Sequence, residues 1–173
     1  EEALLRGVNV FTSPAGTSGV GLGLVDLDGD GDPDIVACSG DSDIRFFEND
    51  GQGFFTDQTI TAGANNFINP GCIATGDIDG DRDLDIFVGC FNSPDRILIN
   101  EGNFEFSELS WTLQVQGNSR TTGASFVDIN GDQWLDLIIS CGSFNGSDSW
   151  NKIYFNTGIG IFELGNIPEF NIP

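Results

Sequence analysis

The chain has 173 residues, 39% of them hydrophobic, and a formal net charge of −21 at pH 7. Its 15 phenylalanines help to supply a sizeable core, which excludes a disordered acidic polymer. Nucleic acid and anionic membranes require Lys or Arg, of which the chain has 6, so we expect cations as partners instead. No apolar run approaches the roughly 20 residues that cross a bilayer.

Residues 14–64 form the first predicted unit and consist of short strands. An apolar run, "GLGLV", leads into the acidic stretch "DLDGDGDPD", and "DIVACS", "IRFFEN" and "GFFTDQTIT" follow between turns. No segment keeps an apolar period of 3.6 residues for the length of a helix. The pattern predicts four antiparallel strands.

The same pattern returns in residues 65–115 and 116–173. "VDLDGDGDPDIVA", "GDIDGDRDLDIFV" and "VDINGDQWLDLII" align without a gap, and their leading aspartates are 51 residues apart each time. A later motif carries Asn49, Asn100 and Asn156, with a five-residue insertion before the third. Such a period indicates a repeat architecture. We therefore predict an all-β fold of β-propeller type, with three four-stranded antiparallel blades in one repeat domain.

The acidic loop of each repeat has the ligand spacing of a calcium site. In the first loop, aspartates occupy positions 1, 3, 5 and 9, and the carbonyl of position 7 adds another oxygen. Ca²⁺ takes about 6–8 oxygens in flexible geometry, whereas Mg²⁺ requires a stricter octahedron and Zn²⁺ prefers His or Cys. The chain has no His. We predict up to three bound calcium ions.

The predicted ligands take the same positions in the three acidic loops, residues 26–34, 77–85 and 128–136. The side-chain ligands are Asp26, Asp28, Asp30, Asp34, Asp77, Asp79, Asp81, Asp85, Asp128, Asn130, Asp132 and Asp136, and the carbonyl ligands are those of Asp32, Asp83 and Trp134. Position 6 changes from Gly31 to Arg82 and then Gln133, which predicts weaker binding or a different backbone path. The alternative, acidic turns on a solvated surface, does not explain three copies in one register.

The stretch "DLDGDGDPD", followed by "FFENDGQGFFTD", resembles the FG-GAP/VCBS repeats. These are calcium-binding blades of integrin α-subunit propellers and of many secreted surface proteins. The resemblance covers nearly the whole chain in three units. It implies that the acidic loop joins the first and second strands of each blade and that the aligned aspartates are the ligands. It says little about function, because such blades serve adhesion receptors, lectins and accessory domains of enzymes.

Three blades are fewer than the four to eight of a typical propeller, so the ring is incomplete. Either the chain is an excerpt of a longer propeller, or two or more chains complete a ring, or the blades stack end to end in an open assembly. Residues 1–13 lie one period before residues 52–64 and are predicted to be an outer strand without its own blade. The last segment, "FELGNIPEFNIP", should pair poorly because of its prolines. These two ends predict strand exchange into a homo-oligomer or filament with head-to-tail contacts.

The predicted function is a non-catalytic, calcium-stabilised scaffold with a structural or adhesive role. The chain has no imidazole base and one lysine, Lys152, although carboxylate pairs for glycoside hydrolysis stay open. One alternative is a lectin, in which Trp111, Trp134 or Trp150 stacks on a sugar. Another is an excerpt of a cell-surface adhesion receptor. The partners would then be glycans or other surface proteins.

Calcium, cysteines and a sequon favour secretion or the cell surface. Extracellular calcium fills even weak sites. The sequence "NGS" makes Asn145 a candidate for N-glycosylation. Four cysteines suit disulfides, with four free thiols as the alternative. Cys72 and Cys90 lie symmetrically about Asp81, so a regular hairpin would place them opposite each other and allow a disulfide.

Overall fold

The computed structural model describes residues 6–8, 20–39, 42–63, 67, 69–91, 93–109, 120–142 and 151–165. All regular secondary structure in these residues is β, with no helix among them. The strands are β1 (Val20–Val25), β2 (Asp34–Ser39), β3 (Ser42–Asn49), β4 (Phe55–Asp57), β5 (Pro70–Gly76), β6 (Asp85–Cys90), β7 (Arg96–Asn100), β8 (Phe106–Glu108), β9 (Arg120–Val127), β10 (Asp136–Gly142), β11 (Lys152–Asn156) and β12 (Phe162–Leu164).

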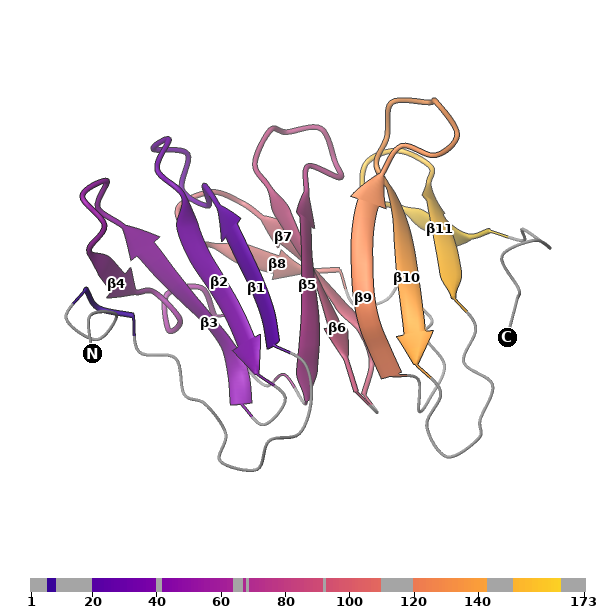
Figure 1. Cartoon of the computed structure of the whole chain (residues 1–173). Helices are drawn as coiled ribbons and strands as arrows, with labels where there is room; N and C mark the ends of the chain where they lie inside the picture. The colour runs from indigo at the N-terminus through magenta and orange to yellow at the C-terminus, as the bar shows by residue number, and fades with distance from the viewer. Residues whose placement is uncertain are drawn as a thin grey trace.

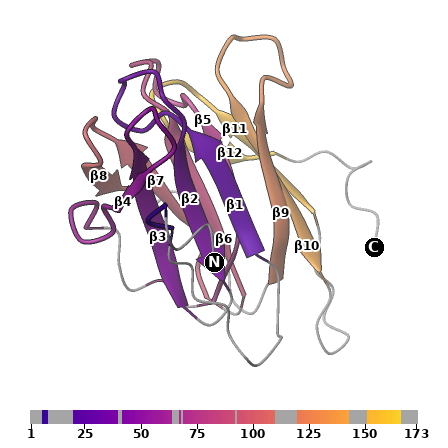
Figure 2. The ribbon, with the colours of Figure 1, turned by 60° about the vertical axis from the view of Figure 1, so that its left-hand side comes forward.

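Each set of four successive strands forms one antiparallel sheet with the strands in chain order. We call these sheets the first blade (β1 to β4), the second blade (β5 to β8) and the third blade (β9 to β12). The first strands are neighbours, with β1 packed beside β5 and β5 beside β9, as in an open arc of propeller blades (Figure 1). Figure 2 shows the same blades from the side of the first one. The predicted all-β, propeller-like fold is confirmed.

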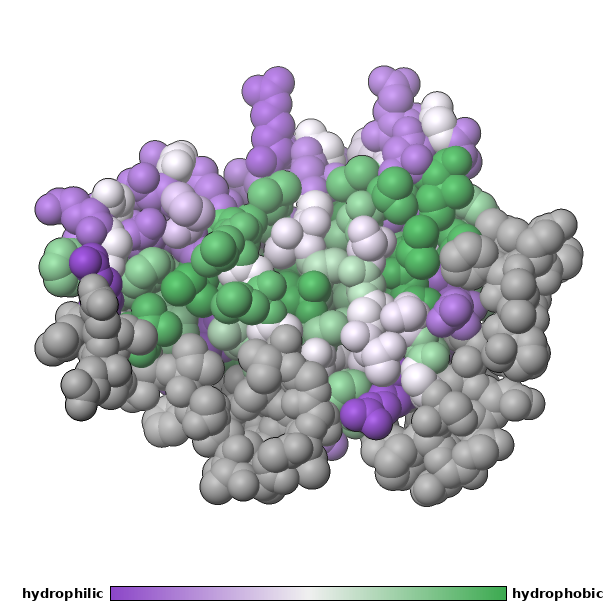
Figure 3. Space-filling model, viewed as in Figure 1, coloured by the Kyte–Doolittle hydropathy of each residue, from purple (hydrophilic) through white to green (hydrophobic). Residues whose placement is uncertain are grey.

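The acidic loops all lie at one end of the molecule, where the first strand of each blade turns into the second (Figure 1). The strand ladder closes on each loop at an equivalent pair, which is Val25 with Asp34, Gly76 with Asp85, and Val127 with Asp136. Hydrophilic residues gather at this end, while hydrophobic residues gather over the strands below it (Figure 3). The loops therefore stand side by side on a common apolar base.

The core consists of two layers, one on each side of the second blade. Val36, Phe46 and Val88 belong to the layer against the first blade, and Phe87 and Leu137 to the layer against the third. Strand β6 is buried at every position because a blade covers each of its faces. This explains why its sequence, "DIFVGC", reads as a continuous apolar run rather than an alternating one.

The outer face of the first blade carries exposed leucines. Added Cβ atoms at Gly21 and Gly23 would meet residues of β5, so this side of β1 faces the second blade. Side chains alternate along a strand, and Leu22 and Leu24 therefore point the other way. They are 63% and 67% exposed. The first blade thus presents apolar surface on the side away from the second.

Part of the predicted N-terminal strand lies against the first blade of the same chain. The carbonyl of Arg6 accepts a hydrogen bond of 2.6 Å from the amide of Phe55 in β4. The Arg6 guanidinium also lies over the Phe54 ring and contacts the carbonyls of Gln52 and Gly53. The rest of residues 1–13, apart from 6–8, and the segment 166–173 lie outside the described residues.

Candidate metal centres

The three acidic loops follow the same backbone path. Position 4 is glycine in each loop, and φ there lies between 80° and 87°. Position 6 also has a positive φ, which is 93° for Gly31, 86° for Arg82 and 78° for Gln133. The predicted change of path is therefore not seen. Arg82 and Gln133 instead adopt the left-handed conformation that glycine reaches at no steric cost.

Glycine at position 6 should stabilise the later loops. The substitution Arg82→Gly is expected to raise the free energy of unfolding by about 1 kcal/mol, because it relieves a left-handed residue that carries a Cβ. Urea denaturation in excess calcium measures this. The control is Gly131→Ala, at position 4 of the third loop. An added Cβ there meets nothing within 4 Å, so the substitution tests the cost of the left-handed backbone conformation alone. We expect it to destabilise; a stabilising Gly131→Ala or a destabilising Arg82→Gly would contradict the assignment of strain.

The carboxylate at position 1 holds each loop in its folded shape. Asp26 accepts hydrogen bonds from the amides of Gly29 (2.8 Å) and Gly31 (3.0 Å) through its two oxygens. The equivalent bonds join Asp77 to Gly80 and Arg82, and Asp128 to Gly131 and Gln133. The loop backbone thus wraps around the first candidate ligand, and hydrogen bonds within the loop hold that carboxylate in place.

The carboxylate at position 9 fixes the base of each loop to the third strand. Asp34 is fully buried and accepts from the amide of Leu27 (2.9 Å) and from that of Asn49 (2.8 Å). Asp85 makes the same bonds to Ile78 and Asn100, and Asp136 to Ile129 and Asn156. Asp85 and Asp136 are also fully buried. Position 9 is therefore both a candidate ligand and a structural anchor.

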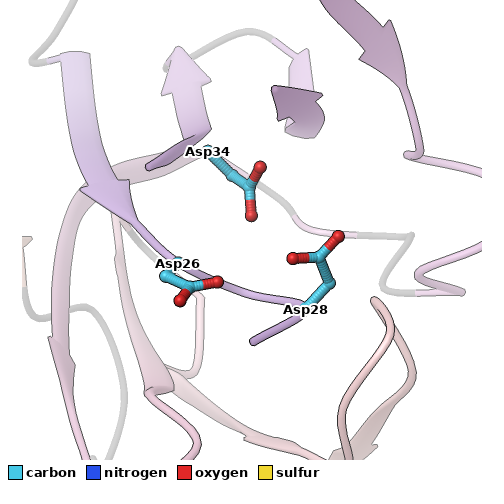
Figure 4. A group of neighbouring side chains, drawn as sticks. All are labelled: Asp26, Asp28 and Asp34. Atoms are coloured by element: carbon cyan, nitrogen blue, oxygen red, sulfur yellow. The ribbon is translucent and has the colours of Figure 1, made fainter. Parts of the chain in front are cut away.

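Three carboxylates converge in each of the first two loops. Oxygens of Asp26, Asp28 and Asp34 lie within 4.8 Å of one another, and Figure 4 shows the three side chains around one space. The equivalent group in the second loop is Asp77, Asp79 and Asp85. These sets contain only hard oxygen donors, which fits Ca²⁺ better than a softer metal. The acidic clusters can therefore hold a metal ion.

The predicted ligands at position 5 lie outside these groups of three. Asp30 accepts from the amide of Asp32, and Asp81 from that of Asp83. In the third loop, Asp132 accepts from the Trp134 amide with one oxygen, and its other oxygen accepts from the side-chain amide of Asn130 (2.8 Å). A cation there would compete with this last bond, which favours a weaker third site.

Residues at position 7 place their side chains against the turn between the third and fourth strands. An added Cβ on Gly51 would lie 2.3 Å from Asp32 Oδ2, and one on Gly102 would lie 3.5 Å from Asp83 Oδ2. In the third blade, Trp134 takes this place, with its indole against Gly158 and against Gly80 of the second loop. Trp134 therefore links two blades.

Burial opposes ionisation of several loop carboxylates. It raises the pKa of Asp28, Asp34 and Asp79 above the ordinary value, although backbone hydrogen bonds to each favour the charged form. The pKa of Asp85 rises to about 7 for the same reason, and Asp79 and Asp81 add repulsion. A bound cation would offset both the burial and the repulsion.

Without metal, the protein should become less stable as the pH rises from 5 to 7. Asp85 has a folded-state pKa of about 7 and an ordinary value of 3.8, so in this range the folded state binds a proton that the unfolded state releases. Asp85 alone should lower the free energy of unfolding by on the order of 2 kcal/mol. Urea denaturation in EDTA at both pH values measures the change, and Asp85→Asn should remove most of it. A stability that rises with pH would contradict the assignment.

The predicted disulfide between Cys72 and Cys90 is wrong. All four cysteines are free thiols. A bulge between Pro70 and Cys72 shifts the register, so Cys72 pairs with Gly89, and the hairpin is not regular. Cys72 consequently packs toward the third blade and Cys90 toward the first. Burial raises the pKa of both thiols to about 12, which keeps them unreactive.

Three candidate residues named from the sequence fall outside the described residues. They are the sequon residue Asn145 and the tryptophans Trp111 and Trp150. Sequence reasoning in turn missed the role of Asn49, Asn100 and Asn156. Their regular recurrence at the end of the third strand was the available signal. Their backbone amides donate hydrogen bonds to the position 9 carboxylates.

Comparison with known proteins gives one family. A model described as FG-GAP-like repeat matches residues 26–88 and 77–139, which together run from the first acidic loop into β10. Among curated proteins, none matches the chain significantly.

The described residues contain no helix of the length and apolar character that a membrane span requires.

Proposed function

Because the chain belongs to the family of FG-GAP-like repeats, we propose that it is a calcium-stabilised, non-catalytic scaffold that acts outside the cell. The observation that carries this proposal is the convergence of three carboxylates in each of two loops, with one fully buried member in each. Buried, mutually repelling carboxylates are unfavourable unless a cation binds them. Calcium is the proposed cation because every candidate ligand is an oxygen.

An extracellular location suits such sites. Exposed calcium loops of this kind need not bind tightly, since weak sites with Kd of about 10⁻⁴–10⁻³ M fill at the calcium concentrations found outside cells. N-glycosylation of Asn145 would belong to the same setting. A non-catalytic role is supported by the lack of His and by the engagement of the loop carboxylates with backbone amides.

A lectin is the second candidate. Of the three tryptophans that could stack on a sugar, Trp134 lies among the described residues. The Trp134 indole already lies against Gly80 and Gly158, which leaves less of its ring for a sugar. A glycan array in calcium and in EDTA tests the choice. We expect no calcium-dependent glycan binding from a scaffold. Specific binding that EDTA abolishes would replace the scaffold by the lectin.

Self-association through the outer blade faces is part of the proposal. Leu22 and Leu24 expose apolar surface on the first blade, and the third blade exposes part of Val127. Burial of apolar area contributes about 25 cal/mol per Å² before the cost of association. Contacts between unlike faces repeat head to tail, which gives a ring or a filament. Exchange of the N-terminal strand would have to displace the Arg6 contact with Phe55.

Charge on the first blade's outer face should abolish association. We expect the double substitution Leu22→Asp and Leu24→Asp to convert oligomers into monomers at micromolar concentration, because burying the new charges is unfavourable. Sedimentation velocity in calcium measures this. Thr56→Asp, on the exposed outer strand β4, is a control for added charge and should leave the oligomers intact. A native chain that is monomeric under these conditions would contradict the proposed assembly.

A further inference from the structure

Two buried asparagines connect the first and second acidic loops with the blade that follows each. The Asn100 side chain of β7 donates from Nδ2 to the carbonyl of Leu27 in the first loop, at 3.1 Å. The Asn156 side chain of β11 donates to the carbonyl of Ile78 in the second loop, at 2.7 Å. Both asparagines are 1% exposed, and both acceptors occupy position 2 of a loop. The two bonds thus repeat one contact across both blade interfaces.

Each asparagine also holds the acidic loop of its own blade. The backbone amide of Asn100 donates to Asp85 Oδ1. Asp85 Oδ2 accepts from the backbone amide of Ile78. The carbonyl of Ile78 in turn accepts from the Asn156 side chain. The amide of Asn156 donates to Asp136. At the other end, the backbone amide of Leu27 donates to Asp34. A series of hydrogen bonds, joined through the residues that make them, therefore runs from the first loop through the second to the third.

From this series we propose that the metal sites bind cooperatively, with Asn100 and Asn156 as positioning residues that couple neighbouring loops. The proposal rests on the calcium binding proposed above. A cation in the first loop fixes Asp34 and, through the amide that Asp34 accepts from, the backbone of Leu27, whose carbonyl Asn100 contacts. Asn100 then holds Asp85 in place before the second loop binds its own cation. The second ion then has less of the second loop to order, so it binds with higher affinity. This is positive coupling between the two sites.

Burial makes this coupling effective. The series lies in low-dielectric surroundings, where an unmade hydrogen bond costs more than it does at the surface. Asp34, Asp85, Asn100 and Asn156 are all 1% exposed or less, and Leu27 and Ile78 are buried as well. Water cannot easily replace a missing partner, so the next blade holds the Leu27 and Ile78 carbonyls in place.

Asn49 provides a matched control within the chain. Its Nδ2 donates to the carbonyl of Pro33 in its own loop (3.0 Å), and its amide holds Asp34. Its Oδ1 accepts from the turn amide of Gly51, as that of Asn100 does from Gly102. Asn49 therefore shares the local role of Asn100 but, among the described residues, makes no bond to another blade's loop.

The test compares Asn100→Asp with Asn49→Asp by calcium titration calorimetry of the full chain. Each change keeps the acceptor for the turn, removes the Nδ2 donor and adds one charge beside a loop. We expect a Hill coefficient above 1 in the native chain and in the Asn49 variant, and a fall toward 1 in the Asn100 variant. A native coefficient of 1, or an equal loss in both variants, would overturn the coupling.

A second measurement serves if the Asn100 variant does not fold. In the native background, Asp28→Asn weakens the first loop, and we expect the calcium affinity of the second loop to fall by about fivefold. Unchanged affinity would overturn the coupling. Trp134 fluorescence in a chain with Trp111→Phe and Trp150→Phe reports occupancy of the second loop, against which its indole lies. A native chain that binds no calcium would instead refute the proposed function, so the two failures are distinguishable.

Discussion

Chelation of calcium by EDTA should lower the Tm of this protein by about 10 °C or more. A ligand that binds only the folded state adds RT ln(1 + [L]/Kd) to its stability. For sites with Kd near 10⁻⁴ M in 2 mM calcium, this is about 2 kcal/mol per site, and 1 kcal/mol shifts Tm by about 2–4 °C in a domain of this size. Two or three sites give the expected shift.

Thermal unfolding followed by circular dichroism measures this effect. Replacement of calcium by an equal concentration of magnesium is the first control, because Mg²⁺ requires stricter octahedral geometry and should restore little of the lost stability. Added sodium chloride is the second, since it screens the net charge of −21 without filling the sites. An unchanged Tm in EDTA, or full recovery with salt alone, would contradict calcium stabilisation.

Truncation of a position 9 carboxylate should be the most destabilising single change in a loop. Asp85→Ala leaves the buried amides of Ile78 and Asn100 without their acceptor, and it removes one candidate ligand. Each unsatisfied buried group costs about 1–3 kcal/mol, so we expect a loss of about 3–5 kcal/mol in calcium. Urea denaturation measures it.

Asp81→Ala is the matched control for this substitution. Asp81 is exposed, and its bond to the Asp83 amide lies at the surface. We expect it to weaken calcium binding while costing less than about 1 kcal/mol in EDTA. If Asp85→Ala were no more destabilising than Asp81→Ala in calcium, position 9 would not be the anchor that its burial indicates.

The repeat, the strands and the acidic loops could be predicted because each depends on residues close together in sequence. Glycines and aspartates at fixed positions determine the loop shape, and Asp26 shows why, since its bonds reach only to Gly29 and Gly31. The apolar runs on either side then form the first and second strands. These local patterns were sufficient to place the carboxylates that the structure brings together.

Features that depend on irregularity or on contact between blades could not be predicted. The bulge beside Pro70 separates Cys72 from Cys90, and no local residue pattern revealed it. The bond from Asn100 to Leu27 joins residues 73 positions apart, so it exists only once two blades have packed. Arg82 keeps a backbone conformation typical of glycine because the hydrogen bond from its amide to Asp77 fixes it.

The number of calcium ions bound per chain tests the central claim most directly. Equilibrium dialysis of the full chain against radioactive calcium, after removal of metal with EDTA, counts the ions that the folded protein holds. The convergent carboxylates of the first and second loops predict at least two ions per chain at saturation, and a third where the Asn130 loop also fills. A folded chain that binds none at millimolar calcium would contradict the account.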